Sequence, residues 1–263
     1  MNLTHSNLRI AIKMSIELLL QEGKEVPTSS WHAMARDDGL FQTLEILNHS
    51  FTCPLPKHLA DLKEMAHPDL PWSDKHFEER VSRIPYNPPP SYREWPYWRP
   101  ESEQTKETPD GKFSHSYPER FWPPSGYGIR YPFGNLDDVV DLLARDPYTR
   151  QANFSIWSLE DNGSKMGVRV PCTLNYYFLM RRSELNLFYE IRSCDALRFL
   201  RDDIYMACRL NLWVLNELSK KDSFWRSITP GCFSFHVYSL HVLLKEVPLL
   251  RHRLKEIEED GKG

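Results

Sequence analysis

Two short motifs at the ends of a predicted β-hairpin carry residue types used in nucleophilic catalysis. Pro171-Cys172 opens the hairpin, and Arg192-Ser193-Cys194-Asp195 closes it. A cysteine thiolate is a strong nucleophile, and a nearby arginine lowers the thiol pKa and can bind phosphate. The order indicates a Cys172 nucleophile beside an arginine. Two structural alternatives remain: a cysteine at a strand start can be a small buried hydrophobe, and Arg192 with Asp195 can form a surface ion pair.

Other polar residues lie at positions that suit a binding site. His236 and Tyr238 share one face of a predicted strand, Arg150 follows the turn DPYT, and Tyr127 precedes a glycine. Each also has a structural interpretation. The histidine and tyrosine can form a satisfied pair, an arginine in a turn is usually solvated, and a Tyr-Gly pair can mark a turn.

The periodicity of apolar residues predicts the elements that position these motifs. Helical spacing predicts helices over residues 6–22, 38–48, 57–66, 73–82, 135–144 and 202–220. Strands are predicted over residues 151–157, 173–180, 185–192 and 232–242, with 173–180 and 185–192 joined as an antiparallel hairpin. The fold class is therefore α+β, and the second half of the chain is the more regular.

Proline is concentrated in the first half of the chain. Fifteen of the 20 prolines lie between Pro54 and Pro132, and long helices cannot run through such a stretch. Residues 84–124 nevertheless contain aromatic side chains, such as Trp95 and Trp122, that are costly to leave in water. We expect an ordered but irregular segment that wraps over the rest of the domain.

Composition excludes several classes of protein. With 263 residues and 41% hydrophobic residues, the chain can bury a sizeable core, and a net charge of -3 disfavours a protein that coats nucleic acid. No apolar run is long enough to span a membrane, and the start of the chain reads as an amphipathic helix, not a signal peptide. The five cysteines show no zinc-ligand spacing and fit a reducing cytoplasm. We therefore expect a cytoplasmic protein with no metal.

Taken in order, the motifs resemble the thymidylate synthase family, which includes the pyrimidine nucleotide hydroxymethylases. The resemblance covers roughly residues 125–242 and rests on Ser155-Ile156-Trp157, Pro171-Cys172, Arg192-Ser193-Cys194-Asp195, Asp203, His236-Val237-Tyr238 and the segments DPYTRQ and SGYGIR. It implies a thymidylate synthase-like domain over residues 1–263, with a mixed or antiparallel sheet, a long central helix and the irregular segment 84–124. Residues 250–263 would form a charged tail.

The resemblance also implies roles for these residues in a homodimer that binds a pyrimidine deoxynucleotide monophosphate. Cys172 would add to C6 of the pyrimidine, which makes C5 nucleophilic toward a one-carbon electrophile. The remaining roles are as follows: Arg192 and Ser193 hold the 5′-phosphate, Arg150 reaches it from the other subunit, His236 and Tyr238 bind the ribose 3′-hydroxyl, Tyr127 contributes to substrate binding, and Asp195 lies near the folate or the base.

Position 203 carries the most informative departure from this pattern. Thymidylate synthases have an asparagine there, whereas the resembling deoxycytidylate hydroxymethylases have an aspartate. A carboxylate can accept from cytosine N4–H and, when protonated, donate to N3. Asp203 thus favours deoxycytidylate 5-hydroxymethylation with 5,10-methylenetetrahydrofolate, as in bacteriophages that modify their DNA. The alternatives are methyl or other C5 transfer on dUMP or a modified base, and a non-catalytic relative that binds a nucleotide or a partner. The structural alternative is an acid in the first helical turn, for which Asp202 is better suited.

Other family features are missing from the sequence. No segment before residue 100 matches the arginine-rich phosphate loop, and the segment that closes over folate has no counterpart. The family's catalytic glutamate cannot be aligned, which leaves Glu45, Asp61 and Glu64 as candidates. Thr173 and Ile191 stand where histidine and glutamine are usual.

Overall fold

A computed structural model describes residues 2–28, 41–98, 110–124, 134–162 and 169–259. The sheet has the strand order β1-β3-β7-β6-β5-β4, with β2 paired to β3. The strands are β1 (Asn2–Thr4), β2 (Lys24–Thr28), β3 (Phe41–Pro54), β4 (Asn153–Ser155), β5 (Thr173–Arg181), β6 (Glu184–Asp195) and β7 (Thr229–Leu243). Strand β7 pairs antiparallel with β3 and parallel with β6, while β5 pairs antiparallel with β6 and β4, so the sheet is mixed.

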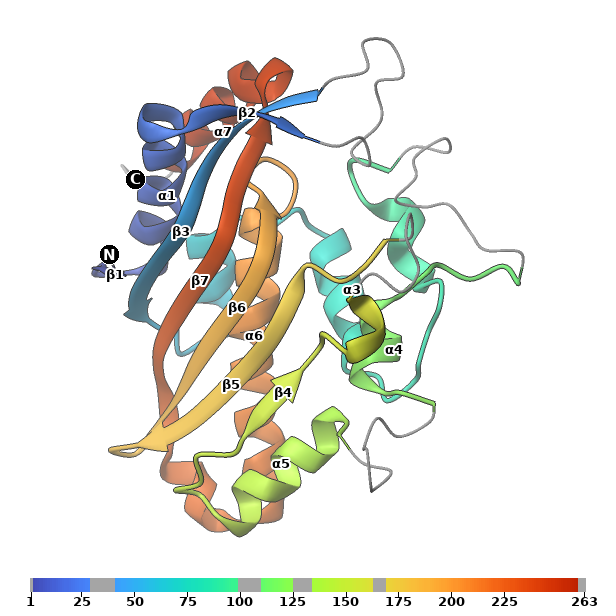
Figure 1. Ribbon diagram of the computed structural model, residues 1–263. Helices are drawn as coiled ribbons and strands as arrows, with labels where there is room; N and C mark the ends of the chain where they lie inside the picture. Colours follow the sequence, from blue (N-terminus) through green and yellow to red (C-terminus); the bar gives the residue numbers. More distant parts are fainter. Residues whose placement is uncertain (1, 29–40, 99–109, 125–133, 163–168, 260–263) are drawn as a thin grey trace.

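The helices lie behind the sheet and at its ends. They are α1 (Leu8–Glu22), α2 (Leu59–Ala66), α3 (Trp72–Arg80), α4 (Tyr117–Phe121), α5 (Leu136–Arg145), α6 (Leu200–Lys221) and α7 (Val247–Glu259). Figure 1 shows α6 running behind the central strands, while no labelled helix crosses the front of the sheet. The front of the sheet is called the open face below. None of the helices in the described ranges is both long enough and apolar enough to cross a membrane.

The core forms between the back of the sheet and α6. Alternate side chains of β5, β6 and β7, among them Tyr176, Tyr189 and Phe235, are buried there, and the Tyr176 and Tyr189 rings stack at 4.8 Å. Their neighbours along each strand face the open side, where Phe188 and Tyr238 are exposed. This alternation follows from the two-residue period of a strand, so a residue's parity decides whether it faces the core or the open face.

Residues 41–48 do not form the helix predicted over residues 38–48. The described part of this range belongs to β3, which pairs with β7 from Thr43↔Leu243 to Pro54↔Cys232. The apolar residues of this segment occur at helical spacing, but a partner strand about 190 to 200 residues away supplies the hydrogen bonds that set its conformation. Such tertiary pairing overrides a weak local preference.

The proline-rich segment is ordered wherever it is described. Trp95, Phe121 and Trp122 are buried, and the Trp122 indole N–H donates to the Arg80 carbonyl at 2.7 Å. The segment therefore packs against α3, as the cost of exposing its aromatic side chains predicts. At the other end of the chain, the expected charged tail begins inside α7, which buries Leu250 and Ile257.

Candidate active site

A cavity of about 120 Å³ opens where β5 begins and β6 and β7 end, beside α3 and α6. Four of the sequence-predicted residues line it: Cys172, Ser193, Asp195 and Asp203. Aromatic side chains from α3, from the proline-rich segment and from the residue before α6 form much of its wall: Trp72, Tyr92, Trp95, Phe113, Tyr117 and Phe199. The cavity combines apolar walls with a few convergent polar groups, which is typical of a small-molecule site.

Cys172 immediately precedes β5, and Arg192 on the neighbouring strand fixes the backbone around it. The Arg192 backbone N–H donates to the Cys172 carbonyl at 2.9 Å, and its guanidinium donates to the Pro171 carbonyl at 2.8 Å. The Arg192 guanidinium also lies 3.9 Å from the Cys172 Sγ. Burial raises the pKa of the Cys172 thiol, while the positive charges of Arg192 and Arg169 act in the opposite direction.

Asp203 lies in the first turn of α6, with a side chain that is 7% exposed. No described residue donates a hydrogen bond to its carboxylate. Burial raises the pKa of Asp203 to about 7, with Arg80 lowering it and Asp202 raising it further. Near neutral pH the group therefore divides between its charged and neutral forms.

Asp202 differs from Asp203 although it is the adjacent residue. Successive helical residues are separated by about 100° around the axis, so the two side chains point to different neighbours. Asp202 accepts hydrogen bonds from the Asp69 backbone N–H at 2.8 Å and from the Ser73 hydroxyl, which ties α6 to the start of α3. Asp202 is structural, whereas the adjacent carboxylate faces the cavity.

Asp195 lines the cavity, but hydrogen bonds within the β6–α6 turn hold its carboxylate. It accepts from the backbone N–H groups of Leu197 at 2.9 Å and Arg198 at 3.1 Å. It also pairs with the Arg198 guanidinium at 2.5 Å, and Arg198 pairs in turn with Glu246 at 2.5 Å. This buried network fixes the turn between β6, which carries Ser193, and the start of α6.

The sequence analysis missed two polar side chains that α3 contributes to the cavity. His76 stacks on Trp72 at 5.2 Å, and burial together with Arg80 lowers the pKa of His76 to about 4. Arg80 is 3% exposed, and its guanidinium lies 4.0 Å above the centre of the Tyr117 ring. The i, i+4 spacing of Trp72, His76 and Arg80 could have identified this helix face.

Three further polar side chains of the lining, His115, Arg169 and His241, were also missed. His115 lies within the proline-rich segment, where no periodicity marks a residue as buried. Burial and the charge of Arg169 lower the pKa of its imidazole well below the usual value. His241 lies three residues after Tyr238 on the same predicted strand. The two-residue period of a strand therefore predicts that its side chain faces the opposite side of the sheet from Tyr238.

A search of solved structures places this fold. Thermostable thymidylate synthase A from Bacillus subtilis is similar over 94% of this chain and 84% of its own, with a TM-score of 0.64 and 14% sequence identity. The chain has the thymidylate synthase fold. No protein-family model and no curated protein matches the sequence. The fold implied by the motif resemblance, a mixed sheet with helices, is confirmed.

Within the thymidylate synthase fold, His236 and Tyr238 lie outside the cavity, on the open face of β7. His236 Nε2 is 2.8 Å from the Asn48 side-chain oxygen. The Tyr238 hydroxyl donates to Glu190 at 2.6 Å, and Asn175 donates to the same carboxylate at 2.8 Å. Their predicted role in ribose binding thus requires a nucleotide that extends from the cavity to the open face.

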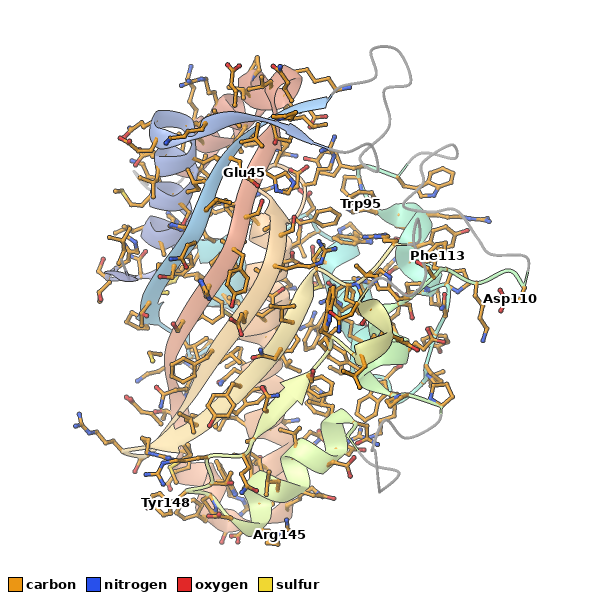
Figure 2. All side chains as sticks on the ribbon, in the orientation of Figure 1. Glu45, Trp95, Asp110, Phe113, Arg145 and Tyr148 are labelled. Atoms are coloured by element: carbon orange, nitrogen blue, oxygen red, sulfur yellow. The ribbon has the colours of Figure 1, made fainter. Side chains whose placement is uncertain are left out.

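Two predicted residues remain, Arg150 and Tyr127, and Arg150 does not line the cavity of this chain. Arg150 is exposed, and its carbonyl accepts from the Tyr177 hydroxyl at 2.5 Å. Figure 2 shows Tyr148 and Arg145, which mark this turn, at the end of the molecule remote from Trp95 and Phe113. Tyr127 lies outside the described residues.

The candidates for a proton-managing glutamate also lie elsewhere. Glu64 is exposed and pairs with Arg9 at 2.9 Å, Glu45 accepts from the Ser239 hydroxyl, and Asp61 is in the first turn of α2. Among the described lining residues, the carboxylates are Asp195 and Asp203. The parts of the chain that can be searched contain no cluster of ligands for a metal ion.

Proposed function

We propose that this protein transfers a one-carbon group to C5 of a pyrimidine deoxynucleotide, and that its reaction is 5-hydroxymethylation of deoxycytidylate. The observation that carries the proposal is the presence of a cysteine thiol and an unpaired carboxylate, Cys172 and Asp203, in the lining of one cavity. The thymidylate synthase fold is compatible with this chemistry.

Each step of the proposed mechanism assigns a task to a residue of this chain. The Cys172 thiolate adds to C6 of the base, which gives C5 the electron density that it lacks in the free pyrimidine. Arg192, 3.9 Å from the sulfur, favours the thiolate and is available to the 5′-phosphate together with Ser193. C5 bonds to the one-carbon unit and loses its proton to a base, and tetrahydrofolate departs from the transferred carbon. Water then adds to the exocyclic carbon and gives up a proton, and departure of the Cys172 thiolate from C6 restores the C5–C6 double bond.

The described lining fits the ring of a folate donor, which is the part of the donor that must approach the base. The indole N–H groups of Trp72 and Trp95 are buried without a hydrogen-bond partner, and Trp95 stacks on Phe199 at 5.0 Å. Flat aromatic walls with free donors suit a heteroaromatic ring that carries acceptors. When bound, 5,10-methylenetetrahydrofolate supplies an electrophilic methylene group, and Trp72 and Trp95 would hold its ring.

Release of tritium from C5 tests the proposed chemistry. The purified protein is incubated with 5-tritiated dCMP or dUMP, with and without methylenetetrahydrofolate. We expect release from dCMP that depends on Cys172, and we expect Asp203→Asn to shift release toward dUMP. Release from dUMP alone would favour the methyl-transfer alternative. If neither nucleotide releases tritium but dCMP still binds, a non-catalytic nucleotide-binding relative becomes the better description.

We further propose a homodimer in which the open faces of two sheets meet. Leu47, Phe188 and Tyr238 are exposed on β3, β6 and β7, and the Arg150 turn is remote from the cavity of its own chain. Arg150 would therefore serve the phosphate site of the partner. Mixing inactive Arg150→Ala and Cys172→Ala chains tests this arrangement, because heterodimers would regain one intact site, giving about a quarter of wild-type activity. A mixture that stays inactive while heterodimers form would contradict it.

A further inference from the structure

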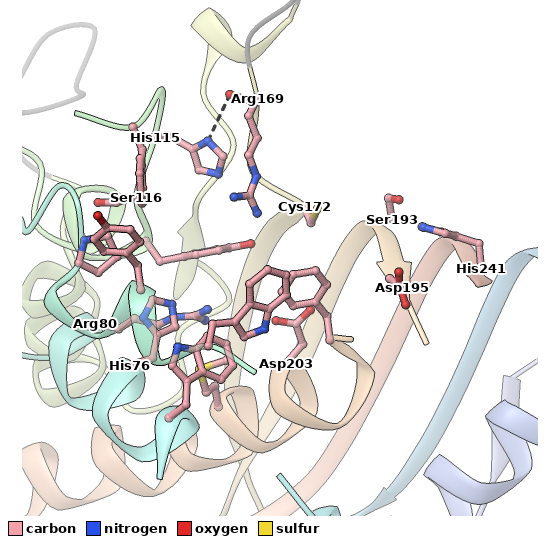
Figure 3. Close-up of a pocket in the computed structure, with 18 residues that line it drawn as sticks. His76, Arg80, His115, Ser116, Arg169, Cys172, Ser193, Asp195, Asp203 and His241 are labelled. Carbon is pink, nitrogen blue, oxygen red and sulfur yellow. Dashed lines mark hydrogen bonds between the residues drawn. The ribbon is translucent and has the colours of Figure 1, made fainter. Parts of the chain in front are cut away.

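Two buried groups of opposite charge line the cavity without contacting each other. Arg80 on α3 is 3% exposed and Asp203 on α6 is 7% exposed. The charge of Arg80 lowers the pKa of Asp203, yet no ion pair joins them, and no described carboxylate lies within ion-pair distance of the Arg80 guanidinium. Figure 3 shows Arg80, Asp203, Cys172 and Arg169 converging on one space from different segments.

This arrangement is costly unless a ligand completes it. A buried charge without a hydrogen-bonded partner loses its hydration and gains little in return. The Arg80 guanidinium is nevertheless held in position, because it stacks on the Tyr117 ring while its own backbone carbonyl accepts from Trp122. Its Nε has no hydrogen-bond partner. Arg80 is thus a fixed donor and Asp203 a fixed acceptor, and a third group that contacts both could bind in the space between them.

We propose that Arg80 and Asp203 together read the pairing edge of cytosine, with Asp203 accepting from N4–H and Arg80 donating to N3 and O2. This inference rests on the proposed function and makes Arg80 a second residue that determines the choice of base. Cytosine presents one donor followed by two acceptors, and a carboxylate beside a guanidinium presents the complementary acceptor and donors. The same order of groups occurs on the pairing edge of guanine.

The pair also explains how uracil would be rejected. Uracil presents O4, an acceptor, to the Asp203 carboxylate, and N3–H, a donor, to the Arg80 guanidinium. Both contacts then place like groups together, and a buried polar group left without a partner is costly. A site built on such contacts discriminates more strongly than one that uses shape alone. An ionised Asp203 by itself could reject uracil only at O4, because its second oxygen can accept from N3–H.

The protonation state of Asp203 distinguishes this scheme from recognition by Asp203 alone. If Asp203 alone read both N4–H and N3, its bound form would be the protonated acid. With Arg80 as the donor to N3, the bound form is the carboxylate. Burial raises the pKa of Asp203 to about 7. Binding of dCMP should therefore strengthen as pH rises through neutrality in the Arg80 scheme, and weaken over the same range if Asp203 acts alone.

Ionisable groups from several elements face Asp203. They are Arg80 from α3, Tyr117 from α4, Arg169 and Cys172 before β5, Tyr176 from β5, Tyr189 and Cys194 from β6, and Asp202 beside it. The arginines stay charged, and burial raises the pKa of each tyrosine and cysteine above its usual value. Burial raises the pKa of Asp202 to about 6, so its titration overlaps the acidic end of the range. Asp202 is also present in the Asp203→Asn reference, which removes its contribution.

Calorimetric titration of the full chain with dCMP and with 3-deazadeoxycytidylate, in which C–H replaces N3, tests the proposal. We expect the wild-type protein to bind the deaza compound at least about tenfold more weakly. Arg80→Gln should bind the two compounds within about twofold of each other. Arg80→Lys, which keeps the charge without the planar fork, should fall between these limits. A series from about pH 6 to about pH 8.5, referenced to Asp203→Asn, removes the contribution of the phosphate ionisation.

Each outcome of this experiment decides the proposal. Equal binding of dCMP and the deaza compound by wild type overturns it even if Arg80→Gln does not fold, while leaving the one-carbon transfer intact. Full discrimination retained in Arg80→Gln, or affinity that falls as pH rises, has the same consequence. A loss in Arg80→Gln confined to folate affinity assigns the guanidinium to the second substrate and overturns base reading. Absence of dCMP binding to wild type overturns both this inference and the proposed function.

Discussion

The cavity and the open face of the sheet carry similar polar side chains but satisfy them to different degrees. On the open face, Glu190 accepts from Tyr238 and Asn175, and His236 contacts Asn48, so the polar groups form a connected network. In the cavity, Asp203 and Arg80 are more deeply buried, yet they share no hydrogen bond or ion pair. The open face resembles a surface prepared to contact ribose, phosphate or a second chain, whereas the cavity resembles a site that a base must complete.

The largest expected effect comes from replacing Cys172, which lies at the boundary between the cavity and the open face. Cys172→Ala should lower C5 transfer by at least about 10⁴-fold, because no other described lining residue offers a thiol beside an arginine. Nucleotide binding should survive, since the groups that would hold base and phosphate remain. Tritium release and calorimetry measure the two properties separately. Cys194→Ala, a buried cysteine two residues from Arg192, serves as the control and should keep the transfer activity.

Two carboxylates on β6 allow the comparison to be tested by stability. Asp195→Asn should lower the free energy of unfolding by about 3 kcal/mol, because Arg198 loses the more deeply buried of its two carboxylate partners. Glu190→Gln on the open face of the same strand should cost less than about 1 kcal/mol, because its network is half exposed to solvent. Urea unfolding at neutral pH measures both. Equal losses in the two variants would contradict the assignment of one region as buried and the other as open.

The unpaired carboxylate in the cavity should make stability depend on pH. A carboxyl group with a raised folded-state pKa binds its proton more tightly in the folded state, so its destabilising effect grows as pH rises from the unfolded pKa to the folded one. For Asp203 this window extends from 3.8 to about 7. Asp203→Asn should therefore raise the free energy of unfolding by about 2 kcal/mol at pH 8, and by almost nothing near pH 4. A gain that is equal at both pH values would indicate a packing effect instead.

The sequence predicted the parts of the site that are held by local structure. Cys172 and Asp195 were correctly placed at the two ends of one hairpin, because strand alternation and a short turn define that hairpin locally. Residues 38–48 were misassigned because the hydrogen bonds of β3 come from a strand far along the chain. Arg80 was missed for a related reason. A charged residue on a short helix normally faces water, and only the proline-rich segment packed over α3 buries this one.

The smallest expected effect tests whether the open face contacts the substrate at all. Tyr238→Phe removes a hydroxyl that donates to Glu190 at 2.6 Å on an exposed residue, so stability should change by less than about 0.5 kcal/mol. If a nucleotide extends from the cavity to this face, the lost hydrogen bond should raise the KM for dCMP by about five- to tenfold while kcat changes little. Deoxycytidylate without a 3′-hydroxyl supplies the matched probe, because it should bind wild type and the Tyr238→Phe variant with similar affinity. If the variant binds this analogue more weakly than wild type does, Tyr238 acts through the packing of the sheet and not through the 3′-hydroxyl. The substrate would then end at the boundary between the cavity and the open face.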